Sequence, residues 1–269
     1  MIKLIASDMD GTLLNDRKEL PGDFFEVFDE LERRGIKFTV ASGRSFDAVA
    51  HLFPEEYRTR LDFICDNGAN VIHEGKQVSV TPLDRPTFEQ LIRACEDIGG
   101  LRILVCAGRG TYHLTADAEF SAEIAKYYKN HIPCDDLLSV DDVIYKLAVC
   151  DMKGTQQHAK PAIDAIFGDR LNVQVSGPIW MDVMGAGVSK GSALRALGKH
   201  LGISADDTMA FGDFYNDADM LKYAGWSFAM ENGNPDIKRM TRFLARSNNE
   251  NGVLRAIRKY ALQEDSIKQ

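Results

Sequence analysis

The feature that most constrains the fold is a repeated order of short apolar run, polar loop and amphipathic segment. The run Ile2–Ser7 stops at Asp8, and residues 22–34 then carry apolar side chains at helical spacing before Gly35. A second β-rich run, Ile36–Val40, follows and also ends in a polar loop. Strands and helices that alternate in this way form parallel sheets, because helices supply the crossover connections.

The same order returns near the end of the chain. It predicts a helix over Lys190–Leu201, a strand over Thr208–Phe211 and a polar loop at Gly212–Asp217. Between the two ends the pattern changes to less regular helix and strand pairs. Single cores stop growing efficiently at roughly 250 to 300 residues, so a chain of 269 residues suits two domains. We expect an α/β fold with a Rossmann-like parallel-sheet core at residues 1–82 and 182–269, and an inserted α+β domain at residues 83–181.

The charge balance limits the partners of the chain. Forty acidic and 32 basic residues give a formal charge of −8, which repels nucleic acid and anionic membrane surfaces. Phosphorylated small molecules are still compatible with this charge if a metal ion and a few cations reverse the field locally. The five scattered cysteines, without a C-x-x-C pair, predict free thiols. The lack of a recognisable leader predicts a cytoplasmic protein, and we expect a monomer or weak homodimer.

Two acidic residues at the end of the first predicted strand are the first candidates for chemistry. Asp8 and Asp10 flank Met9, and Gly11 lets the chain turn immediately, so both carboxyl groups can serve one small site. Two carboxylates that share one small site raise each other's pKa unless a cation neutralises them. Hard oxygen ligands of this kind suit Mg²⁺.

Further candidates follow the other predicted strands or open a helix. Taken singly, Ser42 is typical of a helix N-cap and Lys190 of a solvated helix residue. Asp213, Asn216 and Asp217 are typical of a turn. Together they lie beyond the carboxyl ends of strands, where open α/β sheets bind ligands. The combination therefore favours a catalytic site over unrelated structural roles.

At these residues the sequence resembles a known family. It is similar to the haloacid dehalogenase-like hydrolases, and specifically to the Cof-type phosphatases, which carry a large type IIB cap domain between their second and third motifs. The resemblance covers essentially the full chain. The segments that carry it are Asp8–Leu14, Ala41–Arg44, Asp66–Ala69, Ser189–Leu194 and Gly212–Met220.

The resemblance implies a role for each site residue. Asp8 would be the nucleophile that becomes an aspartyl phosphate, and Asp10 would be the general acid and base. The implied ligands of Mg²⁺ are Asp8, the backbone carbonyl of Asp10, and Asp213, with Asp217 supporting them from behind. The implied phosphate-binding groups are Ser42, Gly43, Lys190 and Asn216.

The expected activity is hydrolysis of small phosphate monoesters. Sugar phosphates are the first expectation from the resemblance, with nucleotide or cofactor phosphates as further options, and the inserted domain would act as a substrate-selecting cap. A sugar-phosphate mutase and a non-catalytic phosphometabolite-binding protein are the alternatives. A transport ATPase would need membrane-spanning segments that the sequence lacks, and a dehalogenase would not need the Mg²⁺ ligands.

Overall fold

The computed structural model describes residues 1–115, 120, 124 and 130–263. The chain divides into two compact units. The first consists of residues 1–43, 54–79 and 189–269, and the second of residues 44–53 and 80–188. The expected α/β class with a parallel-sheet core is confirmed.

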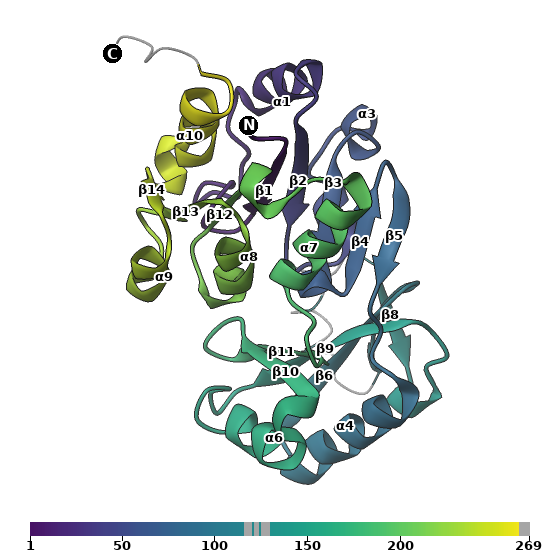
Figure 1. The fold of residues 1–269 in the computed structure, drawn as a ribbon. Helices are drawn as coiled ribbons and strands as arrows, with labels where there is room; N and C mark the ends of the chain where they lie inside the picture. The colour runs from purple at the N-terminus through teal and green to yellow at the C-terminus, as the bar shows by residue number, and fades with distance from the viewer. Residues whose placement is uncertain (116–119, 121–123, 125–129, 264–269) are drawn as a thin grey trace. The chain divides into compact units, whose positions relative to one another are not determined.

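The first unit is built on one mainly parallel sheet, with the strand order β14-β13-β12-β1-β2-β3-β4-β5 (Figure 1). The pairs from β14 through β3 run parallel, and β4 runs antiparallel to β3. The strands are β1 (Leu4–Asp8), β2 (Lys37–Ala41), β3 (Asp62–Cys65), β4 (Asn70–His73), β5 (Lys76–Val80), β12 (Thr208–Gly212), β13 (Trp226–Met230) and β14 (Phe243–Ala245).

Helices cover both faces of this sheet because successive side chains of a strand point to opposite sides. Leu4 and Ala6 pack in one core with residues of α7 and α8, whereas Phe38 of β2 contacts Phe24 of α1. The α-helices of this unit are α1 (Phe24–Arg33), α3 (Glu55–Arg58), α7 (Lys190–Leu201), α8 (Ala218–Tyr223), α9 (Pro235–Met240) and α10 (Gly252–Tyr260). The 3₁₀ turns are η1 (Asp66–Gly68), η4 (Ala205–Asp207), η5 (Tyr215–Asp217) and η6 (Asn248–Glu250).

The second unit has a sheet of its own, with the order β10-β11-β9-β6-β7-β8. One face packs on α4 and α6 through a large apolar core, and the other carries a smaller apolar cluster around Cys106 and Trp180. Its elements are α2 (Phe46–Ala50), α4 (Arg85–Ile98), β6 (Leu101–Ala107), β7 (Gly110–Leu114), β8 (His131–Cys134), η2 (Leu137–Ser139), β9 (Ile144–Asp151), α6 (Ala159–Phe167), η3 (Gly168–Arg170), β10 (Leu171–Val175) and β11 (Trp180–Gly185).

Among the described residues, no helix combines the length and the apolar character needed to cross a membrane.

Candidate active site

Three adjacent strands of the first sheet end at one edge, and this edge carries the predicted site residues. β1 pairs in parallel with β2 on one side and with β12 on the other, so their carboxyl ends lie together. Asp8 is the last residue of β1, Ser42 follows β2 directly, and Asp213 follows β12 directly. Segments from both ends of the sequence thus meet at the switch point where an open α/β sheet binds its ligand.

Lys190 is the first residue of α7, and its side chain reaches Asp8 at the carboxyl end of β1. Ser189 caps the helix, because its hydroxyl accepts from the Ser192 amide while the Ser192 hydroxyl accepts from the Ser189 amide. The Lys190 side chain is fully buried, and its Nζ donates to Asp8 Oδ1 at 2.5 Å and to Asp217 Oδ1 at 2.7 Å. The ammonium is therefore held between two carboxylates.

Both carboxylate oxygens of Asp217 accept hydrogen bonds from the protein. Its Oδ1 accepts from Lys190, and its Oδ2 accepts from the backbone amides of Asp213 at 3.0 Å and Phe214 at 3.1 Å. These bonds fold the loop after β12 back on itself and hold the backbone amides of Asp213 and Phe214 in place. Asp217 therefore fits a supporting role better than that of a metal ligand.

Asp8, Asp213 and Asp217 offer ligand oxygens within 4.8 Å of one another. Burial raises the pKa of Asp8 well above its ordinary value, more than Lys190 lowers it, and the charges of Asp217 and Asp213 raise it further. Burial and repulsion from Asp217 raise the pKa of Asp213 to about 6. Burial alone would lower the pKa of Lys190, but the nearby carboxylates of Asp217 and Asp8 raise it above its ordinary value.

This cluster fits a divalent cation. Three carboxylates and one ammonium leave a surplus of negative charge when all are ionised, and this repulsion adds to burial in raising the pKa values of Asp8 and Asp213. Mg²⁺ is usually held by one or two carboxylates together with water and substrate oxygens. Asp8 and Asp213 supply such a pair.

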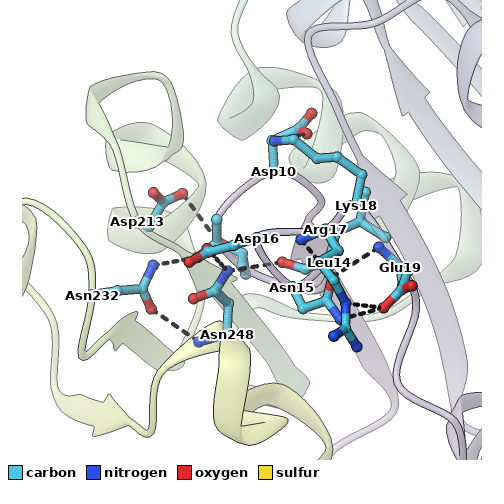
Figure 2. A network of polar contacts seen from close by, with 12 residues as sticks. Asp10, Leu14, Asn15, Asp16, Arg17, Lys18, Glu19, Asp213, Asn232 and Asn248 are labelled. Carbon is cyan, nitrogen blue, oxygen red and sulfur yellow. Dashed lines mark hydrogen bonds and ion pairs between the residues drawn. The ribbon is translucent and has the colours of Figure 1, made fainter.

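The Asp10 carboxylate is paired with Lys18 (Figure 2). Lys18 Nζ lies 2.8 Å from Asp10 Oδ1, and both side chains are partly exposed. Lys18 has a left-handed backbone with φ of 63°. Its loop is closed by the Asn15 side chain, which accepts from the amides of Arg17 and Glu19. Sequence reasoning did not identify Lys18, because a lysine in a polar loop gives no separate signal.

Ser42 and Asn216 lie near a different residue, Asn67. The backbone N–H of Asn67 donates to the Ser42 carbonyl at 3.1 Å, and the Asn216 Nδ2 donates to the Asn67 side-chain Oδ1 at 3.4 Å. Ser42 itself is buried, and its amide donates to the Ile64 carbonyl at 2.8 Å. The structure thus joins Lys190 directly to Asp8 and Asp217, and joins Ser42 and Asn216 through Asn67. The predicted catalytic and binding roles of these residues remain predictions.

Comparison with known proteins decides the family. The sequence profile of the haloacid dehalogenase-like hydrolases matches residues 5–257. The chain belongs to this family. The resemblance inferred from the motifs is thereby confirmed.

Individual relatives extend the match along the whole chain. The 5-amino-6-(5-phospho-D-ribitylamino)uracil phosphatase YbjI of Escherichia coli K12 is 31% identical over 98% of this chain and 97% of that protein. The solved structure of SMU.1108c from Streptococcus mutans UA159 superposes with a TM-score of 0.89, at 28% identity, over 97% of this chain and 100% of that one. The expectation of a phosphatase of this hydrolase family is confirmed.

A third relative shares the fold. The structure of the subclass IIB sugar phosphatase BT4131 superposes with a TM-score of 0.82, at 19% identity, over 97% of this chain and 99% of that one. At this identity the likeness concerns the fold alone.

Three further residues, to which sequence reasoning assigned no role, contact segments of the candidate site, and two of them, Asn232 and Asn248, are labelled in Figure 2. Thr12 Oγ1 donates to Asp213 Oδ1 at 3.1 Å, and Asn232 Nδ2 donates to the Gly11 carbonyl at 2.7 Å. Asn232 also accepts from the amide of Asn248 at 3.0 Å. Gly11 has φ of 83°, and a β-carbon there would lie 2.6 Å from Asp213 Oδ2, so the turn needs glycine. Thr12 stands within the motif Asp8–Leu14, whereas Asn232 and Asn248 give no signal before the fold is known.

Proposed function

We propose that this hydrolase cleaves small phosphate monoesters in a Mg²⁺-dependent reaction that passes through an aspartyl phosphate on Asp8. The observation that carries the proposal is the buried Lys190, whose Nζ bonds both Asp8 and Asp217 at the carboxyl edge of the sheet. A buried cation beside a strand-end carboxylate orients that carboxylate and provides positive charge for phosphoryl oxygens.

The reaction has two halves. In the first, an Asp8 carboxylate oxygen attacks phosphorus, the bond from phosphorus to the ester oxygen breaks, and Asp10 gives its proton to the leaving oxygen. In the second, Asp10 takes a proton from water as the water oxygen attacks phosphorus, and the bond from phosphorus to Asp8 breaks. Inorganic phosphate is released and Asp10 is again protonated.

The residues present fit a bound metal ion at this place. Asp8 and Asp213 would supply carboxylate oxygens and Asp10 its backbone carbonyl. Mg²⁺ would offset the repulsion between an anionic nucleophile and an anionic ester. Asp217 and Thr12 would orient the site, since Asp217 accepts from the Asp213 amide and Thr12 donates to its carboxylate.

A phosphorylated sugar-like compound is the proposed substrate class. The Escherichia coli relative is named for a phosphorylated ribityl chain attached to uracil. The negative charge of −8 argues against nucleic acid and membrane partners, and supports a freely diffusing substrate in the cytoplasm. Residues 83–181 would act as the substrate-selecting cap, with the core formed by residues 1–82 and 182–269.

Phosphate release from a panel of sugar, nucleotide and cofactor phosphates tests the proposal. Release should require Mg²⁺ and stop with a chelator. Metal-independent release would contradict the proposed mechanism. Activity that depends on an added bisphosphate, with transfer instead of release, would identify a mutase.

The covalent intermediate has a test of its own. Asp10→Asn should slow both halves of the reaction, by about 10² to 10⁴, because the amide cannot carry the proton. Rapid quenching followed by mass spectrometry should then show a phosphoryl group on the peptide that contains Asp8. A phosphoryl group on another residue would rule out Asp8 as the nucleophile.

A further inference from the structure

The turn between β3 and β4 has an unusual backbone. Asp66, Asn67 and Gly68 have φ values of 50°, 54° and 106°, so three consecutive residues are left-handed. Residues other than glycine rarely adopt this region, and such conformations persist only where surrounding structure enforces them. Asparagine is among the residues that tolerate it best. The residues packed around the turn must therefore hold it in this conformation.

The middle residue of this turn contacts two segments of the candidate site. Asn67 is buried, with 2% of its surface exposed, and its backbone N–H donates to the Ser42 carbonyl. A β-carbon built on Gly43 would lie 3.0 Å from Asn67 Oδ1 and 3.2 Å from its Nδ2, so the amide group lies against the Gly43 backbone. The same Oδ1 accepts from Asn216 Nδ2 at 3.4 Å.

The last residue of the turn contacts a third segment. A β-carbon on Gly68 would lie 2.2 Å from the Ser189 carbonyl oxygen and 3.1 Å from the Lys190 amide nitrogen. The turn therefore packs directly on the start of α7, and any larger residue at this position would push the two apart. Lys190, the first residue of that helix, carries the buried ammonium of the site.

We propose that Asn67 is a positioning residue for the phosphoryl group. Its side-chain amide lies against Gly43 and accepts from Asn216, and so sets these two segments relative to each other. Its left-handed backbone donates to the Ser42 carbonyl and places Gly68 against the start of α7. The three segments predicted to bind phosphoryl oxygens thus meet at one residue, and the side chain links two of them. This inference rests on the proposed function, because it assumes that these segments bind phosphate.

Two substitutions separate positioning from a purely structural turn. Asn67→Gly keeps the left-handed backbone, since glycine adopts it freely. It keeps the backbone N–H and removes only the side chain with its amide group. Asn70→Ala is the matched control. Asn70 lies three residues later, is also buried, and accepts from Gln77 Nε2 at 2.8 Å on the neighbouring strand β5.

The experiment compares wild type and both variants in the presence of Mg²⁺. Calorimetry measures affinity for inorganic phosphate, steady-state assays measure kcat and KM, and thermal melting measures stability. We expect Asn67→Gly to lower phosphate affinity and kcat by roughly 10- to 100-fold, the scale of a displacement of about 1 Å at a reacting centre. Asn70→Ala should lower the melting temperature at least as much while leaving phosphate affinity and kcat unchanged.

Two results would overturn the inference. One is an Asn67→Gly variant with the phosphate affinity and kcat of wild type. The other is an Asn70→Ala variant that loses as much phosphate affinity and kcat as Asn67→Gly. Failure of the proposed function looks different: wild type would bind phosphate but release none from any ester. In that case the affinities of the two variants still decide the role of Asn67.

Discussion

Two lysines are buried beside carboxylates in the two units, and they differ in where those carboxylates lie: at or just beyond strand ends in the first unit and within a neighbouring strand in the second. Lys190 in the first unit bonds Asp8 at 2.5 Å and Asp217 at 2.7 Å. Lys146 on β9 of the second unit bonds Asp182 on the neighbouring β11 at 2.8 Å. Both ammonium groups are almost fully shielded from solvent. Burial of a lysine therefore does not by itself distinguish a candidate site from a structural pair.

Several carboxylates gather at the buried lysine of the first unit. A third one, Asp213, lies in the same cluster, and the pKa values of Asp8 and Asp213 are raised as a result of burial and mutual repulsion. A site that destabilises its own ionised groups can bind a cation strongly, because the cation relieves that repulsion. The gathered carboxylates make the candidate site a place where a cation would be stabilised.

The largest expected effect concerns Asp8→Asn. Turnover should fall by at least about 10⁴-fold, because an amide of the same shape is a poor nucleophile. Stability without metal should not fall, since one surplus charge is removed and Lys190 keeps Asp217. Phosphate-release rates and urea unfolding of the metal-free variant check the two parts. A clear loss of metal-free stability would break the contrast between the two lysines.

The next effect concerns Asp182→Asn in the second unit. Here the substitution removes a charged partner of Lys146, and breaking a buried ion pair costs about 3 to 5 kcal/mol. Urea unfolding should show the loss, in contrast to Asp8→Asn. A change within about 0.5 kcal/mol, the range of ordinary surface substitutions, would show that the two pairs do not differ in the way described.

Metal binding and pH sharpen the same contrast. A carboxyl group with a raised pKa holds its proton more tightly in the folded state, so the contribution of Asp213 to metal-free stability falls as the pH rises from about 4 to about 6. Mg²⁺ at about 100 times its Kd should stabilise by about 2.7 kcal/mol above that range and by less below it. Thermal melting against pH, with and without Mg²⁺, measures both trends.

Asp213→Asn is the control for this prediction. It removes both the titrating carboxyl and a proposed metal ligand, so the pH dependence and the Mg²⁺ stabilisation should both weaken. Equal Mg²⁺ stabilisation in wild type and variant would place the ion elsewhere.

The smallest effect is expected from Lys18→Met. Its ion pair with Asp10 is partly exposed, and such pairs contribute up to about 1 kcal/mol, so kcat should fall less than about 10-fold. The matched control is Arg17→Met, which removes the neighbouring cation, paired with Glu19. Steady-state rates of the two variants check the prediction. Identical rates would show that the pair does not influence Asp10.

The sequence predicted the parts of the site that motifs place at strand ends. Asp8 and Asp213 follow from apolar runs that stop at acidic residues, and Lys190 from its place at the start of a helix. The predicted helix over Lys190–Leu201 matches α7 in both bounds. These features are local in the chain, so periodicity and capping residues are sufficient to find them.

Other parts depend on contacts between distant segments. Asn232 and Asn248 serve the Gly11 loop from more than two hundred residues away, and nothing in their own neighbourhoods indicates it. Asn67 stands in a segment with ordinary turn composition, and only the fold shows which loops its amide contacts. The Lys146–Asp182 pair joins neighbouring strands whose register the sequence does not specify.

The central place of β1 has a consequence for synthesis of the chain. Its two neighbours are β2, made soon afterwards, and β12, whose Thr208 pairs with Leu4. At a translation rate of about 5 to 20 residues per second, β12 emerges roughly 10 to 40 s after β1. During that interval residues 80–188 of the second unit can fold, while one side of β1 stays without its partner strand. The nascent chain therefore carries an open sheet edge, and Asp8 stays without Lys190 until translation is well advanced.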